Sequence, residues 1–219
     1  LIYRKAAEHG SGHVCSCSWS VKSKNEVTEL KAEWFPKYEV APVDAEGSNL
    51  ISETIFKATK HNKISAEDLA VKSKKEVLNI LMSLVDGYEI WLDKEKHKLS
   101  ELNTSFLKGQ AKKNIDKCKE AIYRMKGGIK YLDNSEQGFE AFQLANNAML
   151  KQFKWTKKIE SKKQNKDLDN DDLKLRWRPF QIGFALLTLE GIGNPNSDDR
   201  KLLDLLWFPT GGGKTEAYL

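Results

Sequence analysis

The feature that most constrains how this 219-residue chain can fold is a glycine-rich loop near its C-terminus. Residues 202–208 are Leu-Leu-Asp-Leu-Leu-Trp-Phe, a short apolar run typical of a buried strand. Residues 209–215 follow as Pro-Thr-Gly-Gly-Gly-Lys-Thr, and residues 216–219 begin a helix. This order of strand, glycine loop, Lys-Thr and helix is that of a phosphate-binding loop. It predicts that residues 175–219 open an α/β nucleotide-binding lobe.

The residue types of this loop suit a nucleoside triphosphate. Three consecutive glycines permit φ values and a close backbone approach that side chains would block, so backbone N–H groups can surround phosphate oxygens. We expect Lys214 to reach the β- and γ-phosphates as a catalytic cation, and the Thr215 hydroxyl to bind Mg²⁺. The strict motif has glycine where this chain has Phe208, so the loop is of the helicase type. The predicted ATP contacts in the loop are Thr210, Gly211, Gly212, Gly213, Lys214, Thr215 and Glu216.

A second cluster precedes the loop, where residues 176–181 read Arg-Trp-Arg-Pro-Phe-Gln. The Gln181 amide can donate one hydrogen bond to an adenine edge and accept another, whereas guanine presents the opposite pattern. We therefore predict that Arg178 and Gln181 contact ATP. In the alternative interpretation, the cluster is only a helix start with Pro179 in the first turn.

Residues 177–181, the pair Asp199-Arg200 and residues 204–219 resemble the DrmA-type helicases of the DISARM phage-defence system, within helicase superfamily 2. Segments 34–40 and 142–149 are also similar to that family. The resemblance implies an ATP-dependent DNA helicase or translocase of antiviral defence, with a RecA-like α/β motor lobe. It also implies ATP and Mg²⁺ as cofactors, and DNA and a partner subunit of the defence complex as partners.

The chain carries only part of such a motor. It begins without Met and ends four residues after Thr215, before any Asp-Glu-x-x box that could hold Mg²⁺ and position water. We therefore expect an N-terminal fragment that is inactive alone, from a parent that hydrolyses ATP. Two alternatives are a helical nucleic-acid-binding or partner-docking module without activity of its own, and a phosphate-loop ATPase that remodels protein.

Residues 1–50 are expected to form a small β-containing region. Residues 13–21 alternate Ser with Cys, Trp and Val, and residues 27–35 are a second extended run, as in a β-hairpin. This alternation places Cys15, Cys17, Trp19 and Val21 on one strand face, which we expect to be buried. A metal site is the alternative, since His9 and His13 lie nearby, but one residue between two cysteines is a short spacing for zinc.

Residues 51–158 are predicted to form a helical accessory domain. Apolar residues recur every three or four positions in 77–92, 115–125 and 139–153, as on the buried faces of amphipathic helices. Ser65 and Ser135 are predicted N-caps.

Two breaks are expected beyond these helices. The Gly127-Gly128 pair is expected to interrupt the second of them. Residues 159–174, rich in Lys and Asp, are expected to form a charged linker before the nucleotide-binding lobe. The predicted fold class is therefore mixed α and β: a small N-terminal hairpin or sheet, a mainly helical middle, and the opening strand and phosphate loop of a motor lobe.

The net charge of +5 is unevenly distributed. Between Asp93 and Lys130 there are eleven Lys or Arg against five Asp or Glu, while the rest of the chain is almost neutral. This excess indicates either the solvated face of helices or a surface that attracts nucleic-acid phosphates. The residues predicted to contact nucleic acid are Lys112, Lys113, Lys117, Lys119 and Arg124.

Composition excludes two classes of protein. Hydrophobic residues make up 40% and aromatic residues 10%, which is enough for a core and argues against a disordered chain. The longest apolar run, 182–189, is far below the roughly 20 residues that cross a bilayer, so we expect no membrane partner. Three cysteines, an odd number, give no disulfide framework and favour a reducing, cytoplasmic location.

Overall fold

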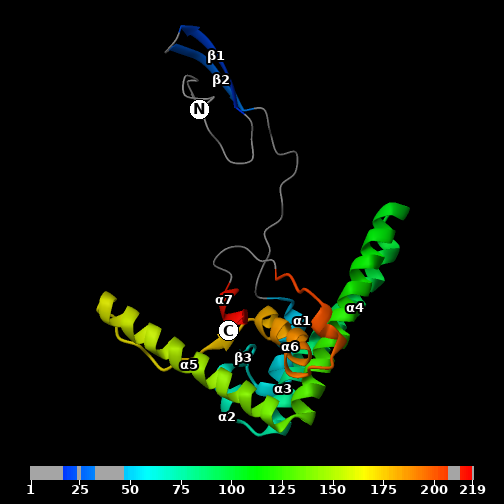
Figure 1. Cartoon of the computed structure of the whole chain (residues 1–219), viewed down its shortest axis with the longest axis vertical. Coiled ribbons are helices and arrows are strands. Elements are labelled where there is room, and N and C mark those ends of the chain that lie inside the picture. The colour runs from blue at the N-terminus through cyan, green and yellow to red at the C-terminus, as the bar shows by residue number, and fades with distance from the viewer. Residues whose placement is uncertain (1–16, 24–25, 33–46, 207–212, 219) are drawn as a thin grey trace. The chain divides into compact units, whose positions relative to one another are not determined.

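The computed structural model describes residues 17–23, 26–32, 47–206 and 213–218, which fall into two units (Figure 1). The first unit, Leu1–Pro42, contains a β-hairpin, and the second, Val43–Leu219, contains the helices. The expected mixture of α and β structure is therefore confirmed, and helices predominate among the described residues.

The hairpin of the first unit consists of β1 (Cys17–Ser23) and β2 (Glu26–Ala32), which pair antiparallel as the alternating pattern predicts. Trp19 lies opposite Leu30. The expected burial of this face is wrong, because Trp19 is 37% exposed, Val21 54% and Leu30 55%. A two-stranded sheet needs a second layer to bury a face, and the described part of this unit contains only the hairpin.

The metal-site alternative concerns the same hairpin. Cys17 is half-buried in β1, while Cys15, His9 and His13 lie outside the described residues. Across the part of the chain that the structure describes, no group of three or more His, Cys, Asp or Glu side chains is placed to hold a metal ion.

The second unit consists of helices with short connections. Its α-helices are α1 (Asn49–Thr59), α2 (Ala66–Val71), α3 (Lys74–His97), α4 (Ser105–Asn134), α5 (Glu136–Gln164), α6 (Pro179–Gly193) and α7 (Thr215–Tyr218). Two 3₁₀ turns, η1 (Lys98–Glu101) and η2 (Asp198–Lys201), follow α3 and α6. The two-residue strands β3 (Ile64–Ser65) and β4 (Arg176–Trp177) pair antiparallel. None of the described helices combines the length and apolar character needed to span a bilayer.

The predicted helical periodicity is confirmed in the core. On α3 it buries Val77, Leu81 and Leu84. Helix α4 buries Ile115, Ile122 and Met125, and α5 buries Phe139, Phe142 and Leu150. Both predicted N-caps are also confirmed: the Ser65 hydroxyl accepts a hydrogen bond from the Asp68 N–H, and the Ser135 hydroxyl accepts one from the Gly138 N–H.

Helix α4 runs without interruption through the Gly127-Gly128 pair, so the expected break there is wrong. Gly128 is instead a point of close packing between α4 and α6. A Cβ atom on Gly128 would overlap the carbonyl oxygen of Leu186, which is itself fully buried. Glycine weakens an isolated helix, but here the missing side chain lets two helices touch. The local pattern suggests a break because the partner of Gly128 lies on another helix.

We expect Gly128→Ala to lower the free energy of unfolding by about 1–2 kcal/mol. Overpacking against backbone atoms costs roughly 1–3 kcal/mol, and the better helix propensity of Ala offsets at most about 1 kcal/mol. Gly109→Ala in the same helix is the matched control, because a Cβ there meets no atom within 4 Å. Urea unfolding compares the two variants. The control should be neutral or stabilising, and equal effects at both positions would contradict close α4–α6 packing.

Two expected features near the C-terminus are wrong. The linker expected at 159–174 begins later, because α5 continues to Gln164 and ends at Asn165, whose φ is 50°. The described part of the strand expected at 202–208 has no regular structure, and Leu203 is 97% exposed. A strand of a parallel sheet needs neighbouring strands, and the described residues place none beside this segment. The RecA-like lobe therefore stays a prediction.

Candidate nucleotide-binding site

The candidate site lies at the junction of β4 and α6. Pro179 occupies the first position of α6, where the missing backbone N–H of proline leaves no helical hydrogen bond unmade. The Arg178 backbone N–H donates to Gln181 Oε1 at 2.9 Å, which satisfies a donor at the helix N-terminus. The interpretation of this cluster as a helix start is therefore confirmed.

Gln181 also joins α6 to the glycine-rich loop. Its Nε2 donates to the Gly213 carbonyl oxygen at 2.7 Å, although the two residues are 32 positions apart in sequence. Gln181 is only 7% exposed, so its amide is held between the helix start and the loop. A Gln side chain has four hydrogen-bonding positions, and these two contacts use two of them. The predicted reading of adenine would use the other two.

The described part of the loop is Gly213, Lys214 and Thr215. Gly213 has a φ of +82°, a backbone conformation that L side chains rarely adopt, as expected of a glycine in a tight loop. Lys214 is half-buried, and its carbonyl oxygen accepts from the Ala217 N–H at 3.0 Å as α7 begins. Outside the described residues lie the other predicted contacts Thr210, Gly211 and Gly212, and the side chain of Glu216.

A cavity of about 400 Å³ lies beside these residues and is within the usual size range of ligand sites. It is bounded by the second half of α5, by β4 with the start of α6, and by the end of the loop. Four residues predicted separately from two motifs share this lining: Arg178, Gln181, Gly213 and Thr215. The structure thus brings the predicted base-reading and phosphate-binding elements to one cavity.

The cavity also has walls that the sequence does not indicate. Gln152, Phe153 and Thr156 of α5 line it, although periodicity assigns Phe153 to the core. Arg176 lines it as well, and Arg176 Nη2 lies 2.6 Å from Asp171 Oδ1. This hydrogen bond lowers the pKa of the Asp171 carboxyl below its usual value. No local signal identifies these residues, because only the folded chain places α5 beside the loop.

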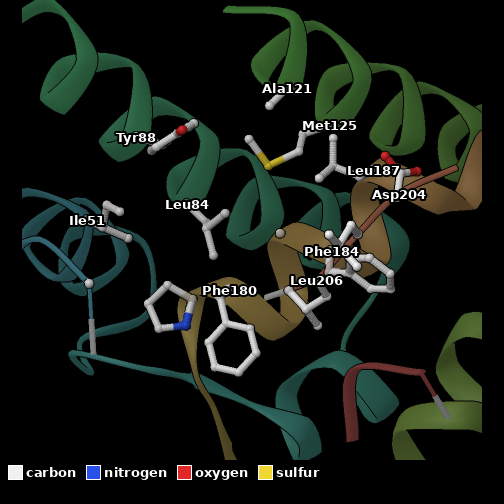
Figure 2. Close-up of a pocket in the computed structure, with 14 residues that line it drawn as sticks. Ile51, Leu84, Tyr88, Ala121, Met125, Phe180, Phe184, Leu187, Asp204 and Leu206 are labelled. Atoms are coloured by element: carbon white, nitrogen blue, oxygen red, sulfur yellow. The ribbon is translucent and has the colours of Figure 1, made fainter. Parts of the chain in front are cut away.

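A second cavity lies between α1, α3, α4 and α6 (Figure 2). Leu84, Met125 and Phe184 point into it from three different helices, and most of its lining is apolar. The carboxylate in its lining, Asp204, is paired with Arg124. Apolar walls do not replace the water around a phosphate, and a carboxylate repels it. The candidate nucleotide site is therefore the first cavity.

Arg124 differs in its surroundings from the other predicted nucleic-acid contacts. Its side chain is 11% exposed, and its guanidinium donates to Asp204 at 2.7 Å and to Asp199 at 2.9 Å. A further bond reaches the carbonyl oxygen of Leu187 at 3.1 Å. The hydrogen bonds with Asp204 raise the pKa of Arg124 and lower the pKa of Asp204. Arg124 is thus engaged inside the fold, where it links α4 to the segment leading to the loop, and is not presented to DNA.

The four lysines predicted with Arg124 lie on the surface. Lys112, Lys113, Lys117 and Lys119 are all exposed on α4. Lys119 Nζ lies 2.9 Å from Asp116 Oδ1, with both side chains more than half exposed, and such a pair stabilises a protein little. Their contact with nucleic acid stays a prediction.

Comparison with known proteins extends the similarity to the whole chain. No protein-family model matches it. The DISARM protein DrmA of Bacillus paralicheniformis is 33% identical over 224 aligned residues, which cover all of this chain and 19% of that relative. The chain thus spans about a fifth of the length of the curated relative it matches. The resemblance predicted from the motifs is confirmed, and it also covers the helices for which the sequence shows no recognised motif.

Proposed function

We propose that this chain, which is similar to the DISARM protein DrmA over its whole length, is the ATP-binding N-terminal part of an ATP-dependent DNA helicase or translocase of bacterial phage defence. The longer protein would hydrolyse ATP with Mg²⁺, act on DNA with a partner subunit of the defence complex, and work in the cytoplasm. Hydrolysis would also need an acidic box that holds Mg²⁺ and positions water, which the longer protein would supply.

The observation that carries this proposal is the hydrogen bond from Gln181 to Gly213. It connects the residue expected to read the base with the loop expected to bind the phosphates, beside a cavity that both residues line. If the two motifs matched by chance, nothing would require Gln181 and Gly213 to be in contact. ATP gives a reason for this contact, since its base and its phosphates are parts of one molecule and must be held at one site.

The described residues suit Mg²⁺-ATP, which would supply the phosphoryl group. The positive φ of Gly213 allows close backbone approach to a phosphate. Lys214 would offset phosphate charge, and the Thr215 hydroxyl would bind Mg²⁺. Arg178 and Gln181 would hold the base end.

Two substitutions at Gln181 separate base reading from helix capping. Gln181→Ala removes both amide contacts, whereas Gln181→Glu keeps an oxygen for the Arg178 N–H and loses the N–H donor. If Gln181 reads adenine, Gln181→Ala should narrow the preference of the longer protein for ATP over GTP by about tenfold, the worth of two neutral hydrogen bonds, and Gln181→Glu, which loses the donated bond, by about threefold or more. The KM values for ATP and GTP measure this preference.

The helix-start role predicts a different outcome for the same pair. Gln181→Ala would lower the free energy of unfolding by about 1 kcal/mol, Gln181→Glu would lower it further because its carboxylate would face the Gly213 carbonyl oxygen at a buried position, and neither would change the ATP/GTP ratio. Gln110→Ala, an exposed site on α4, controls for the loss of an amide elsewhere. An unchanged ratio in both Gln181 variants would reject the adenine role.

A second candidate function is a helical nucleic-acid-binding or partner-docking module without activity of its own. The observation that favours it is the row of exposed lysines on α4, in a unit whose described secondary structure is almost entirely helical. This function needs no role for Lys214, so the ATPase activity of a Lys214 variant of the longer protein distinguishes it from a motor.

A further inference from the structure

The C-terminal half of α5 is a cationic helix that lacks a buried face. Its first half buries Phe139, Phe142 and Leu150, but no residue in 151–164 is buried. This half extends past the helices that cover the first (Figure 1). Its fourteen residues contain six Lys and one Glu.

This charge is partly masked in the sequence, because four Asp follow it in 165–174 and lower the net charge of the two segments together from +5 to +3. The structure separates the two. Asp171 pairs with Lys174 and Arg176. The Asp169 carboxylate accepts from the N–H groups of Asp171 and Asp172 within the same loop. These carboxylates therefore bond within or next to their own loop, and Lys151, Lys158, Lys162 and Lys163 of α5 are exposed to solvent.

Four residues of this half form a stripe that we call the α5 stripe: Lys151, Trp155, Lys158 and Lys162. At about 100° per residue they fall within roughly 60° of one another around the helix axis, and they extend over about 16 Å. All four are exposed, and Trp155 is 65% exposed. A large aromatic ring thus lies in solvent between cations.

We propose that the α5 stripe binds single-stranded DNA, with the lysines on successive phosphates and Trp155 stacked on a base. Lysines attract the backbone through counterion release, and an aromatic ring stacks on any unpaired base. A membrane surface fits less well, because it requires a broad apolar face, and the exposed large apolar residues of this segment are Trp155 and Ile159.

The α5 stripe deepens the proposed function because the same helix borders the candidate nucleotide cavity. Gln152 and Thr156 line that cavity, and around the helix axis they lie about 60° and 100° from Trp155, the nearest residue of the stripe. The α5 stripe would therefore bind DNA, while the neighbouring side of α5, with Gln152 and Thr156, would border the nucleotide. DNA binding needs no nucleotide, so the test below is independent of ATP hydrolysis.

The experiment measures anisotropy of a labelled 20-nucleotide oligo(dT) and of a matching duplex with the 219-residue chain over a range of salt concentrations. The stripe variant is Lys151→Gln, Lys158→Gln and Lys162→Gln together. The matched control is Lys112→Gln, Lys113→Gln and Lys117→Gln on α4, which removes the same charge from the other basic helix. Trp155→Ala and Trp155→Phe test stacking, and circular dichroism checks that each variant keeps its helices.

The stripe variant should reduce the slope of log Kd against log salt by about 2, roughly 0.7 for each lost single-strand phosphate contact. Trp155→Ala should weaken oligo(dT) binding by roughly 5- to 150-fold with an unchanged slope, and Trp155→Phe should restore most of it. The duplex should bind more weakly than oligo(dT).

Three outcomes would overturn the proposal: equal losses in the α4 and α5 variants, an unaffected Trp155→Ala, or binding of anionic vesicles in place of oligo(dT). If oligo(dT) binding fails these tests while Lys214→Ala still reduces ATP hydrolysis, the DNA-binding role of α5 is rejected and the proposed motor is retained. The reverse pattern would leave a DNA-binding module without a motor.

Discussion

Lys214→Ala in the longer protein should reduce ATP turnover by at least about 100-fold. Phosphoryl transfer is accelerated mainly by positioning and by charges that stabilise the transferred group, and loss of one such group typically costs 10²–10³ in rate. We expect the fold to persist, because Lys214 is half-buried at the end of the loop and outside the hydrophobic core. A malachite-green phosphate assay measures the turnover, and thermal melting measures the fold.

The matched control for this variant is Lys201→Ala. Lys201 precedes the loop, and its side chain is 80% exposed in a surface pair with Asp198, so its removal should leave turnover unchanged. Turnover of Lys214→Ala within about threefold of the unmodified protein would reject the phosphate-binding role. It would then favour the binding-module function over the motor.

Arg124→Ala should lower the free energy of unfolding of this chain by about 3 kcal/mol. Removal of one partner from a buried ion pair typically costs 3–5 kcal/mol, because the remaining charges stay desolvated. Asp199 and Asp204 are 23% and 24% exposed, which places the expected loss at the lower end. Arg124→Lys keeps the charge but loses the forked geometry and should show an intermediate loss. Urea unfolding at neutral pH measures all three proteins.

Lys119→Ala is the control for Arg124, because it removes a cation from an exposed pair on the same helix. Its effect should stay within about 0.5 kcal/mol. Equal losses at the two positions would show that Arg124 is a surface residue like Lys119, contrary to its 11% side-chain exposure.

The Arg124–Asp204 pair also predicts an acid dependence. Arg124 lowers the pKa of Asp204 in the folded state, so the unfolded state binds the proton more readily. The stability from this pair is complete above the unfolded pKa, about 3.9, and is lost as pH falls through the lower folded pKa. Between about pH 5 and pH 2, the unmodified chain should therefore lose stability more steeply than Arg124→Ala. Parallel curves would contradict the pairing.

Local patterns in the sequence predicted the helices and caps because their causes lie within a few residues. The Ser65 and Ser135 hydroxyls bond N–H groups three residues away, and an apolar face is defined by spacing along one helix. The start of α6 at Pro179 follows from proline alone.

Features that depend on distant residues were not predictable in this way. The Gly127-Gly128 pair predicts a break in the helix, because the contact of Gly128 with Leu186 of another helix is not visible in the local sequence. The basic segment groups Arg124 with the predicted DNA contacts, because its partner Asp204 is 80 positions away in sequence. The same limit applies to the candidate site: two motifs gave Gln181 and Gly213, but their hydrogen bond and the α5 wall of the cavity appear only in the folded chain.

The contact between Gly128 and Leu186 has a mechanical consequence. Helix α4 continues for 23 residues on the N-terminal side of Gly128, about 34 Å at 1.5 Å per residue, and its first turns are exposed. Because α4 and α6 are in direct contact at this crossing, a change in the angle between them would redirect the far end of α4. A tilt of about 5° at the crossing displaces the far end of α4 by about 3 Å, given that lever length. A small change in the crossing angle would thus correspond to an ångström-scale displacement at Ser105, the first residue of α4.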